Sequence, residues 1–308
     1  MPVRILALTA TAGLLLAGAV GAPVASAHDR PGRAPDAVVV KGAVAVPASY
    51  SVRDLAALPQ TGLPDLRGPR HRGHTVTGTL LEPLVTAAAP VLPAVKNAQL
   101  RVTITVSGRD HRSVAVALGE LASANGNHPA LLVPASGRRH DGVDLVFPGD
   151  RGRSRTVREV STIAVAVAAP EVPTAVPAGL RLVAGARVLT LSATDLGRLP
   201  VTTRQVAFQS GQGPQQHTET GPTLAAVLRA AHLRADPSTT VAAVAGDGYV
   251  ATVSPAEATA GRRTLLLATV EDGVPLDQPR LVTDGDVSGG RYVSDVLALQ
   301  VSAAGRCG

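Results

Sequence analysis

The chain has 308 residues, with 29 Lys and Arg against 23 Asp and Glu, no Trp, and an aromatic content of 2%. So few aromatic side chains leave little scope for stacking on bases or sugars, and no Arg-dense run is interleaved with aromatics, which argues against a nucleic-acid-binding protein. The formal charge of +6 predicts a mildly basic, solvated surface, with attraction to acidic cell-surface polymers as the weaker alternative.

The first residues predict export. A short basic start, MPVR, precedes an apolar run over 5–24 and the small-residue sequence ASA at 25–27, so we expect a secretory signal peptide over 1–27 that is cut after Ala27. A retained membrane anchor is the alternative, but the apolar run is short and rich in small residues. No Arg-Arg pair precedes the run, so twin-arginine export is not indicated. These features predict a secreted or extracytoplasmic protein with no membrane span after cleavage.

Four sequence blocks recur in the same order along the remaining chain, which indicates a duplication. One domain is predicted over 37–168 and a second over 180–303, with a proline-rich, extended linker over 169–179 between them. The paired blocks are 51–59 with 192–200, 74–89 with 217–232, 105–121 with 243–258, and 147–165 with 282–301.

Each unit is predicted to begin with two short strands around a Gly turn, over 37–50 and 181–191. A short helix follows, N-capped by Ser51 or Ser192. An amphipathic helix, a strand, a short helix, an apolar strand and a closing strand come next. Their predicted ranges, in that order, are 79–89, 100–106, 117–122, 129–135 and 161–167 in the first unit, and 222–232, 239–245, 254–259, 263–270 and 296–301 in the second. The predicted fold class is therefore α+β, strand-dominated, with two similar domains.

The last block carries a resemblance to a known family. The segment GVPLDQPRLVTDGDVSGGRYVSDVLALQV (273–301), preceded by AGDGYVATVSPAE (245–257), resembles the oxidoreductase molybdopterin-binding domain of the sulfite oxidase superfamily, and is most similar to its short secreted bacterial members. The first unit carries a more divergent version of the pattern. The resemblance implies two tandem sulfite-oxidase-type domains. Enzymes of that superfamily hold a molybdenum cofactor through a cysteine thiolate in the middle of the domain, so the resemblance also implies such a cofactor.

The chain departs from that pattern at the expected metal ligand. Its only cysteine is Cys307, and Ser210 stands where we would look for the thiolate in the second unit. A serine hydroxyl is a poor ligand for a soft metal. Proteins of this group that carry the cofactor use twin-arginine export, which this signal does not resemble. We therefore expect no bound cofactor, with molybdopterin as the alternative.

Three functional hypotheses remain. The first is a secreted, non-catalytic binding or scaffold protein, whose partner is a small anionic ligand or a cell-surface component. The second is an oxidoreductase that retains a molybdopterin cofactor without thiolate ligation. The third is a cell-surface interaction protein that forms a disulfide dimer through Cys307. No residue is assigned a catalytic role, and no metal site is predicted, because His71 and His74 lack carboxylate or Cys partners at ligand spacing.

His74 and His217 are the first ligand-binding candidates. They open the sequences HTVTG and HTETG, which we expect to lie just before a helix N-terminus. Free N–H groups and the helix dipole favour an anion at such a place. The alternative is that the Thr and Gly cap the helix, with the His solvated or bonded to backbone.

The second motif is Asp286 followed by Arg291, with Asp150 followed by Arg155 in the first unit. In the family this turn lies close to the cofactor pocket, and an Arg binds phosphate or carboxylate bidentately. The alternative is an Asp–Arg pair within each domain that pins a Gly-rich turn to the closing strand.

The third motif is the tight turn of Asp247, Gly248 and Tyr249, from which Tyr249 could face a pocket. The range 109–111 is expected at the equivalent place in the first unit. A purely structural turn is the alternative.

Overall fold

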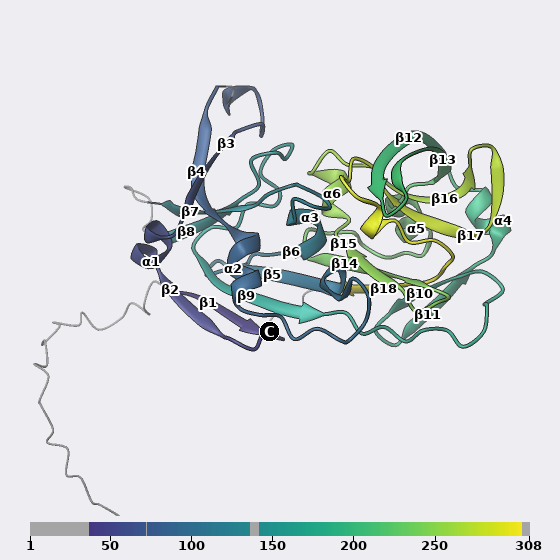
Figure 1. Cartoon of the computed structure of the whole chain (residues 1–308), viewed down its shortest axis with the longest axis horizontal. Helices are drawn as coiled ribbons and strands as arrows, with labels where there is room; N and C mark the ends of the chain where they lie inside the picture. Colours follow the sequence, from purple (N-terminus) through teal and green to yellow (C-terminus); the bar gives the residue numbers. More distant parts are fainter. Residues whose placement is uncertain (1–36, 72, 136–141, 304–308) are drawn as a thin grey trace, which may run out of the picture. The chain divides into compact units, whose positions relative to one another are not determined.

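The structure, a computed structural model, describes residues 37–71, 73–135 and 142–303. Strands dominate these residues and form two pairs of β-sheets, so the predicted α+β class with two domains is confirmed. Figure 1 shows the first half of the chain in purple to teal and the second half in green to yellow. The expected signal peptide over 1–27 and Cys307 lie outside the described residues.

The strands and helices of the first half come in an order that the second half repeats. In the first half they are β1 (Ala37–Gly42), β2 (Ala48–Ser51), α1 (Val52–Ala57), β3 (Gln60–Pro64), β4 (Thr75–Leu80), α2 (Leu81–Ala87), β5 (Val102–Gly108), β6 (Ser113–Ala117), α3 (Leu118–Leu121), β7 (Leu131–Ala135), β8 (Gly142–Val146) and β9 (Val160–Val167), with 3-10 turns η1 (Pro69–His71) and η2 (Ala98–Arg101).

In the second half they are β10 (Leu180–Ala184), β11 (Arg187–Leu191), α4 (Ala193–Gly197), β12 (Val201–Ser210), β13 (Gly213–Pro222), α5 (Leu224–Ala230), β14 (Thr239–Ala245), β15 (Val250–Val253), α6 (Ala256–Thr259), β16 (Leu265–Glu271), β17 (Val274–Thr283) and β18 (Val296–Ala303), with the 3-10 turn η3 (Gly289–Arg291).

The sheets have the same strand order in both halves. The five-stranded sheets run β2-β1-β9-β5-β6 and β11-β10-β18-β14-β15. The four-stranded sheets run β3-β4-β7-β8 and β12-β13-β16-β17. The pairs β1 with β9 and β10 with β18 are parallel. Every strand of the first half therefore has a counterpart at the same sheet position in the second.

Local sequence explains the shortest elements. Ser51 accepts a hydrogen bond from the N–H of Asp54, whose carboxylate accepts one from Ser51 in return, and Ser192 and Asp195 form the same reciprocal cap. This capping box satisfies N–H groups that a helix end leaves without partners. The predicted N-caps are therefore confirmed. On α5, Leu224, Val227 and Leu228 have the helical spacing that buries one face in the core.

The HTVTG and HTETG sequences precede a helix as expected, with two residues between each block and its helix, but they lie in or beside strands rather than in loops. His74 comes directly before β4, and His217 lies inside β13, while α2 and α5 begin only at Leu81 and Leu224. These strands were not predicted, because alternating polar side chains on an exposed hairpin carry no apolar signal for a strand. Thr223, placed on the helix by sequence, is its N-cap instead.

Glycine recurs in these sequences because two strands approach closely. A Cβ atom built on Gly221 would lie 2.1 Å from the carbonyl oxygen of Leu267 on β16. A Cβ atom on Gly78 would lie 2.6 Å from the carbonyl oxygen of Leu132 on β7. The backbone of the neighbouring strand thus occupies the space of any side chain at either position.

The two halves contact each other through the edges of the five-stranded sheets, where β6 packs against β14 and β15. The Ala115 N–H donates to the Pro237 carbonyl at 2.8 Å. The Thr252 hydroxyl donates to the Leu100 carbonyl at 2.9 Å. Val172, from the expected linker, packs against a small apolar cluster of the second half. Backbone carbonyls of both halves thus accept hydrogen bonds across the contact between them.

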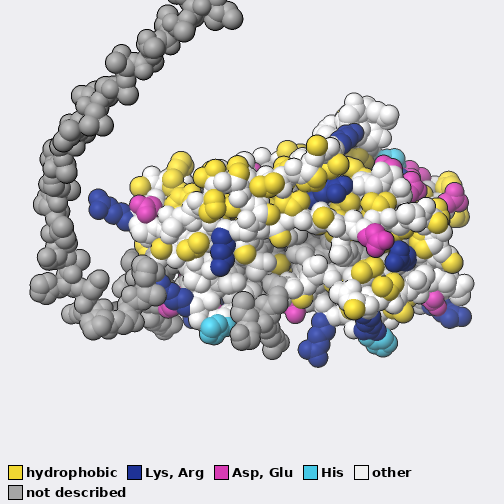
Figure 2. Space-filling model, turned by 90° about the horizontal axis from the view of Figure 1, so that it is seen from below, with side chains coloured by type: hydrophobic (Ala, Val, Ile, Leu, Met, Phe, Trp, Pro, Cys, Tyr) yellow, Lys and Arg dark blue, Asp and Glu magenta, His cyan; other side chains and the backbone are white. Residues whose placement is uncertain are grey.

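The surface mixes residue types. On the face shown in Figure 2, Lys and Arg side chains are spread singly among hydrophobic and acidic ones. Over the described ranges, no helix is both long enough and apolar enough to cross a membrane.

Candidate functional site

A tight turn has the same hydrogen bonds in both halves. The carboxylate of Asp247 accepts the N–H of Tyr249 at 2.8 Å, and Gly248 between them has φ +83°. In the first half the carboxylate of Asp110 accepts the N–H of Arg112 at 3.0 Å. The counterpart of Tyr249 is therefore Arg112, and the range 109–111 expected from sequence is wrong by one residue.

The segments that contain Asp150 and Arg155 in the first half, and Asp286 and Arg291 in the second, also form matching backbone hydrogen bonds. Tyr292 donates its N–H to the Gly289 carbonyl at 3.0 Å, and Thr156 donates to the Arg153 carbonyl at 3.1 Å. The β-bridge of Leu281 to Val293 matches that of Leu145 to Val157. Gly289, Tyr292 and Ser294 thus correspond to Arg153, Thr156 and Arg158.

A cavity with a volume of about 990 Å³ opens beside these turns of the second half. Its walls come from η2 and residues 124–125 of the first half, from the tip of the β12–β13 hairpin, and from the two turns. The lining residues are Lys96, Asn97, Gln99, Leu100, Ala124, Asn125, Phe208, Gln209, Ser210, Gly211, Ala245, Gly246, Asp247, Tyr249, Ser288, Gly289, Gly290, Tyr292, Ser294 and Asp295. We call it the interdomain cavity.

Aromatic side chains concentrate at the interdomain cavity. The chain has three Tyr, two Phe and no Trp, and Phe208, Tyr249 and Tyr292 all line this cavity. The Phe208 and Tyr292 ring centroids are 4.3 Å apart. A Cβ atom on Gly289 would lie 2.7 Å from the Phe208 ring, so the ring occupies the space that a side chain at this position would need. The scarce aromatic side chains are therefore gathered rather than spread.

Hydrogen bonds between the halves fix the cavity walls. The Tyr249 hydroxyl donates to the Gly290 carbonyl at 2.6 Å and accepts from the Asn97 amide at 3.0 Å. The Asn125 carbonyl accepts the Val287 N–H at 2.8 Å. Burial raises the pKa of Tyr249 above its usual value, so the hydroxyl remains a donor at neutral pH. A ligand would meet walls that are already ordered.

Arg155 and Arg291 do not line this cavity; both are 0% exposed. Arg291 donates to both oxygens of Asp286, at 2.8 and 2.6 Å, and to both oxygens of Glu257, at 2.8 Å. Arg155 donates in the same way to Asp150, at 2.9 and 2.6 Å. The sequence alternative of an Asp–Arg pair within each half is thus what the structure shows, with a buried Glu as a further partner.

The two buried charge clusters interlock across the halves. A Cβ atom on Gly119, next to Glu120, would lie 2.8 Å from Cδ of Arg291, and one on Gly261 would lie 3.0 Å from a guanidinium nitrogen of Arg155. Burial raises the pKa of Glu257 to about 7, with Arg291 opposing the shift, and it raises the pKa of Glu120 in the same direction. Each arginine is therefore shielded from solvent and bonded within its own half, while its side chain lies against a glycine of the other half.

His74 and His217 are not brought together with the other candidates. His217 contacts the Asp272 carboxylate at 2.9 Å, and its ring stacks on Phe208 with centroids 6.1 Å apart. His74 lies against the ring of His71, with centroids 6.4 Å apart. Of the ligand-binding candidates predicted from the sequence, only Asp247 and Tyr249 line the interdomain cavity. Sequence reasoning missed Asn97, which the structure places in a left-handed backbone conformation at φ 56°.

The residues of the interdomain cavity do not fit a thiolate-ligated molybdenum cofactor. Ser210, at the hairpin tip, donates its hydroxyl to the Gly213 carbonyl at 3.0 Å and accepts from the Gln212 N–H at 3.1 Å, so the turn already uses it. Cys and His are missing from the lining, which has one cation, Lys96, and two carboxylates, Asp247 and Asp295. A phosphate-bearing cofactor would meet more negative than positive charge there. In the described part of the chain, no three His, Cys, Asp or Glu residues are grouped to hold a metal ion.

Comparisons with known proteins give a likeness in structure but none in sequence. No family model matches the chain. No curated protein matches it either. Among solved structures, the sulfane dehydrogenase SoxCD from Paracoccus pantotrophus is similar with a TM-score of 0.30 and 15% identity, over 77% of this chain and 76% of that chain.

Proposed function

We propose that this is a secreted, non-catalytic binding protein of two tandem domains, 37–168 and 180–303, and that its interdomain cavity binds a neutral polyhydroxylated ring of the sugar class. The observation that carries the proposal is the gathering of Phe208, Tyr249 and Tyr292 at one cavity of a chain with three Tyr, two Phe and no Trp. Although the low aromatic content argued against stacking on sugars, these three side chains at one cavity provide a local surface for it. Such a ligand suits a cell-surface component as partner.

The chemistry of the lining supports a sugar ring. Aromatic faces pack against the C–H face of such a ring and exclude water from it. Side-chain amides both donate and accept, which matches hydroxyl groups that do the same. Four amides line the cavity, from Asn97, Gln99, Asn125 and Gln209. A volume of about 990 Å³ is at the upper end of the range for small-molecule sites.

The non-catalytic part of the proposal rests on the donor set. The resemblance to the sulfite oxidase superfamily implies a thiolate that this chain replaces with Ser210, and that hydroxyl is held within its own turn. Neither Arg155 nor Arg291 is accessible to a substrate, since both are 0% exposed. We therefore infer that the chain keeps the fold of a cofactor protein and uses its cavity for binding alone.

Tyrosine fluorescence tests the sugar assignment. The chain has no Trp and three Tyr, two of which line the cavity, while Tyr50 packs on the first-half core. Sugars do not absorb ultraviolet light, so titration with glucose, galactose, mannose and N-acetylglucosamine should change the emission saturably for at least one of them. Tyr50→Phe should leave that change intact, whereas Tyr292→Phe should reduce it.

A matched pair of variants on β12 provides the control. Gln209→Ala removes a lining amide and should weaken binding about fivefold, as expected for one hydrogen bond of about 1 kcal/mol. Gln205→Ala, on the same strand but outside the lining, should leave the affinity unchanged. An emission that stays flat with all four sugars contradicts the assignment.

A further inference from the structure

The first half has its own cavity at the position that corresponds to the interdomain cavity. It has a volume of about 310 Å³, and its lining residues are Arg67, Asp110, Arg112, Arg153, Thr156 and Arg158. We call it the arginine cavity. Asp110 and Arg112 belong to the turn that matches Asp247 and Tyr249, as their hydrogen bonds show. The repeated fold therefore places a cavity at the same turns twice.

The lining differs between the two cavities in one consistent way. Where the interdomain cavity has Tyr249, Gly289 and Ser294, the arginine cavity has an arginine. Those arginines are Arg112, Arg153 and Arg158. Three uncharged positions are thus replaced by three cations, at places fixed by shared backbone hydrogen bonds.

The carboxylates around the arginine cavity neutralise only part of its positive charge. Four Arg against one Asp give the lining a formal charge of 4 − 1 = +3, and Asp65, which pairs with Arg67, lowers it to +2. Arg67 is paired with Asp65 at 2.6 Å, and its hydrogen bonds hold the pKa of that carboxyl at about 2. Arg112 donates to the Ser154 carbonyl at 2.7 Å, and Arg153 contacts the His71 ring at 3.1 Å. Within the described ranges, neither Arg112 nor Arg153 has a side-chain ion pair with a carboxylate.

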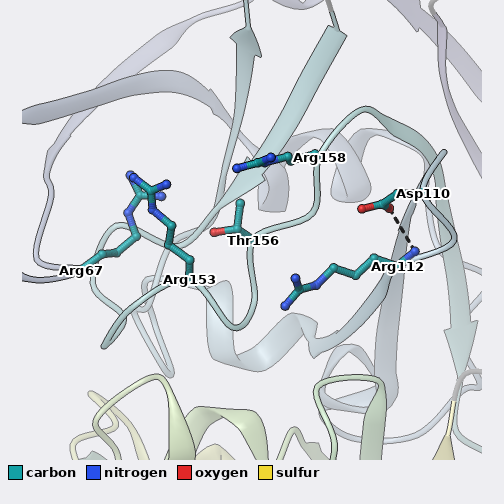
Figure 3. Close-up of a pocket in the computed structure, with 6 residues that line it drawn as sticks. All are labelled: Arg67, Asp110, Arg112, Arg153, Thr156 and Arg158. Carbon is teal, nitrogen blue, oxygen red and sulfur yellow. Dashed lines mark hydrogen bonds between the residues drawn. The ribbon is translucent and has the colours of Figure 1, made fainter. Parts of the chain in front are cut away.

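The guanidinium groups surround a hydroxyl. Figure 3 shows Thr156 in the middle, with Arg67 and Arg153 on one side, Arg112 on the other and Arg158 above. Arg112, Arg153 and Arg158 are exposed, so an anion from solution can reach them. Like charges held close together are unfavourable unless an anion lies between them.

We propose that the arginine cavity binds a tetrahedral dianion, such as the phosphate group of a phosphomonoester. Planar guanidinium forks donate in pairs to the oxygens of such a group, and the Thr156 hydroxyl provides one more donor. A volume of about 310 Å³ accommodates one such group with a small substituent. This site is separate from the interdomain cavity, so it does not depend on the sugar assignment.

Isothermal titration calorimetry with inorganic phosphate at low ionic strength tests the proposal. The full chain should bind one phosphate saturably. Arg153→Gln and Arg158→Gln should each weaken binding at least tenfold. Arg187→Gln removes the same charge from an exposed position on β11 and should leave the affinity within twofold.

Two further titrations identify the class of phosphate compound that the cavity binds. Glycerol 3-phosphate, a monoester, should bind within tenfold of phosphate, and dimethyl phosphate, a monoanionic diester, should bind at least tenfold more weakly. The proposal is overturned by an absence of saturable heat with phosphate, or by an equal loss in Arg187→Gln and Arg153→Gln. Equal binding of dimethyl phosphate and phosphate overturns the requirement for a dianion.

Discussion

Replacing Arg291 with methionine should lower the free energy of unfolding by about 3–5 kcal/mol, as for the loss of one partner from a buried ion pair. Arg291 is 0% exposed and donates four hydrogen bonds to Asp286 and Glu257. Methionine fills similar space but leaves both carboxylates buried with one fewer cation. Because domains are stable by only about 5–15 kcal/mol, the variant should unfold at a much lower urea concentration. Circular dichroism during urea unfolding measures this.

An exposed arginine is the control for that variant. Arg198 has a 76% exposed side chain and lies 3.8 Å from Asp195. Exposed pairs contribute about 0–1 kcal/mol, so Arg198→Met should barely move the unfolding midpoint. If Arg291→Met were as stable as Arg198→Met, the buried ion pairs of Arg291 would not contribute the stability expected of them.

Gly221→Ala should destabilise the chain by about 1–3 kcal/mol, the usual cost of forcing extra atoms into a packed site. The new methyl group would lie 2.1 Å from the Leu267 carbonyl oxygen and 2.7 Å from Cα of Ala268. Both atoms belong to the backbone of β16, so no flexible side chain can move aside. Strands β13 and β16 must separate to admit the methyl group, and thermal unfolding should show a lower midpoint.

Gly197→Ala should change stability in the opposite direction. No atom lies within 4 Å of a Cβ built on Gly197, which is the last residue of α4. Alanine is favoured over glycine in helices by up to about 1 kcal/mol. A Gly221→Ala protein as stable as the Gly197→Ala protein would show that the close strand approach tolerates a side chain.

The elements that sequence predicted well carry their own local signals. The capping boxes at Ser51 and Ser192 and the apolar spacing of α5 depend only on neighbouring residues. The β12–β13 hairpin was missed because most of its side chains are polar or exposed, and its glycine is required by a strand distant in sequence. Contacts of that kind are set by the tertiary fold.

Tertiary contacts also limited how many residues of the cavities could be predicted from the sequence. Tyr249 and Asp247 were candidates because their turn is visible in the sequence. Asn97 and Phe208 reach the interdomain cavity only after the halves pack together. The one-residue error at 109–111 arose because His111, at φ 60°, takes the positive-φ position that Gly248 holds in the second half. A left-handed histidine gives a much weaker turn signal than glycine.

Molybdenum analysis of protein purified from its native host tests the central claim most directly, because the host supplies the cofactor if the chain can hold it. With Ser210 held in its own turn and no Cys or His in the cavity lining, we expect molybdenum far below one atom per chain by elemental mass spectrometry. A stoichiometric molybdenum content would contradict the account and would make the interdomain cavity a cofactor site without thiolate ligation.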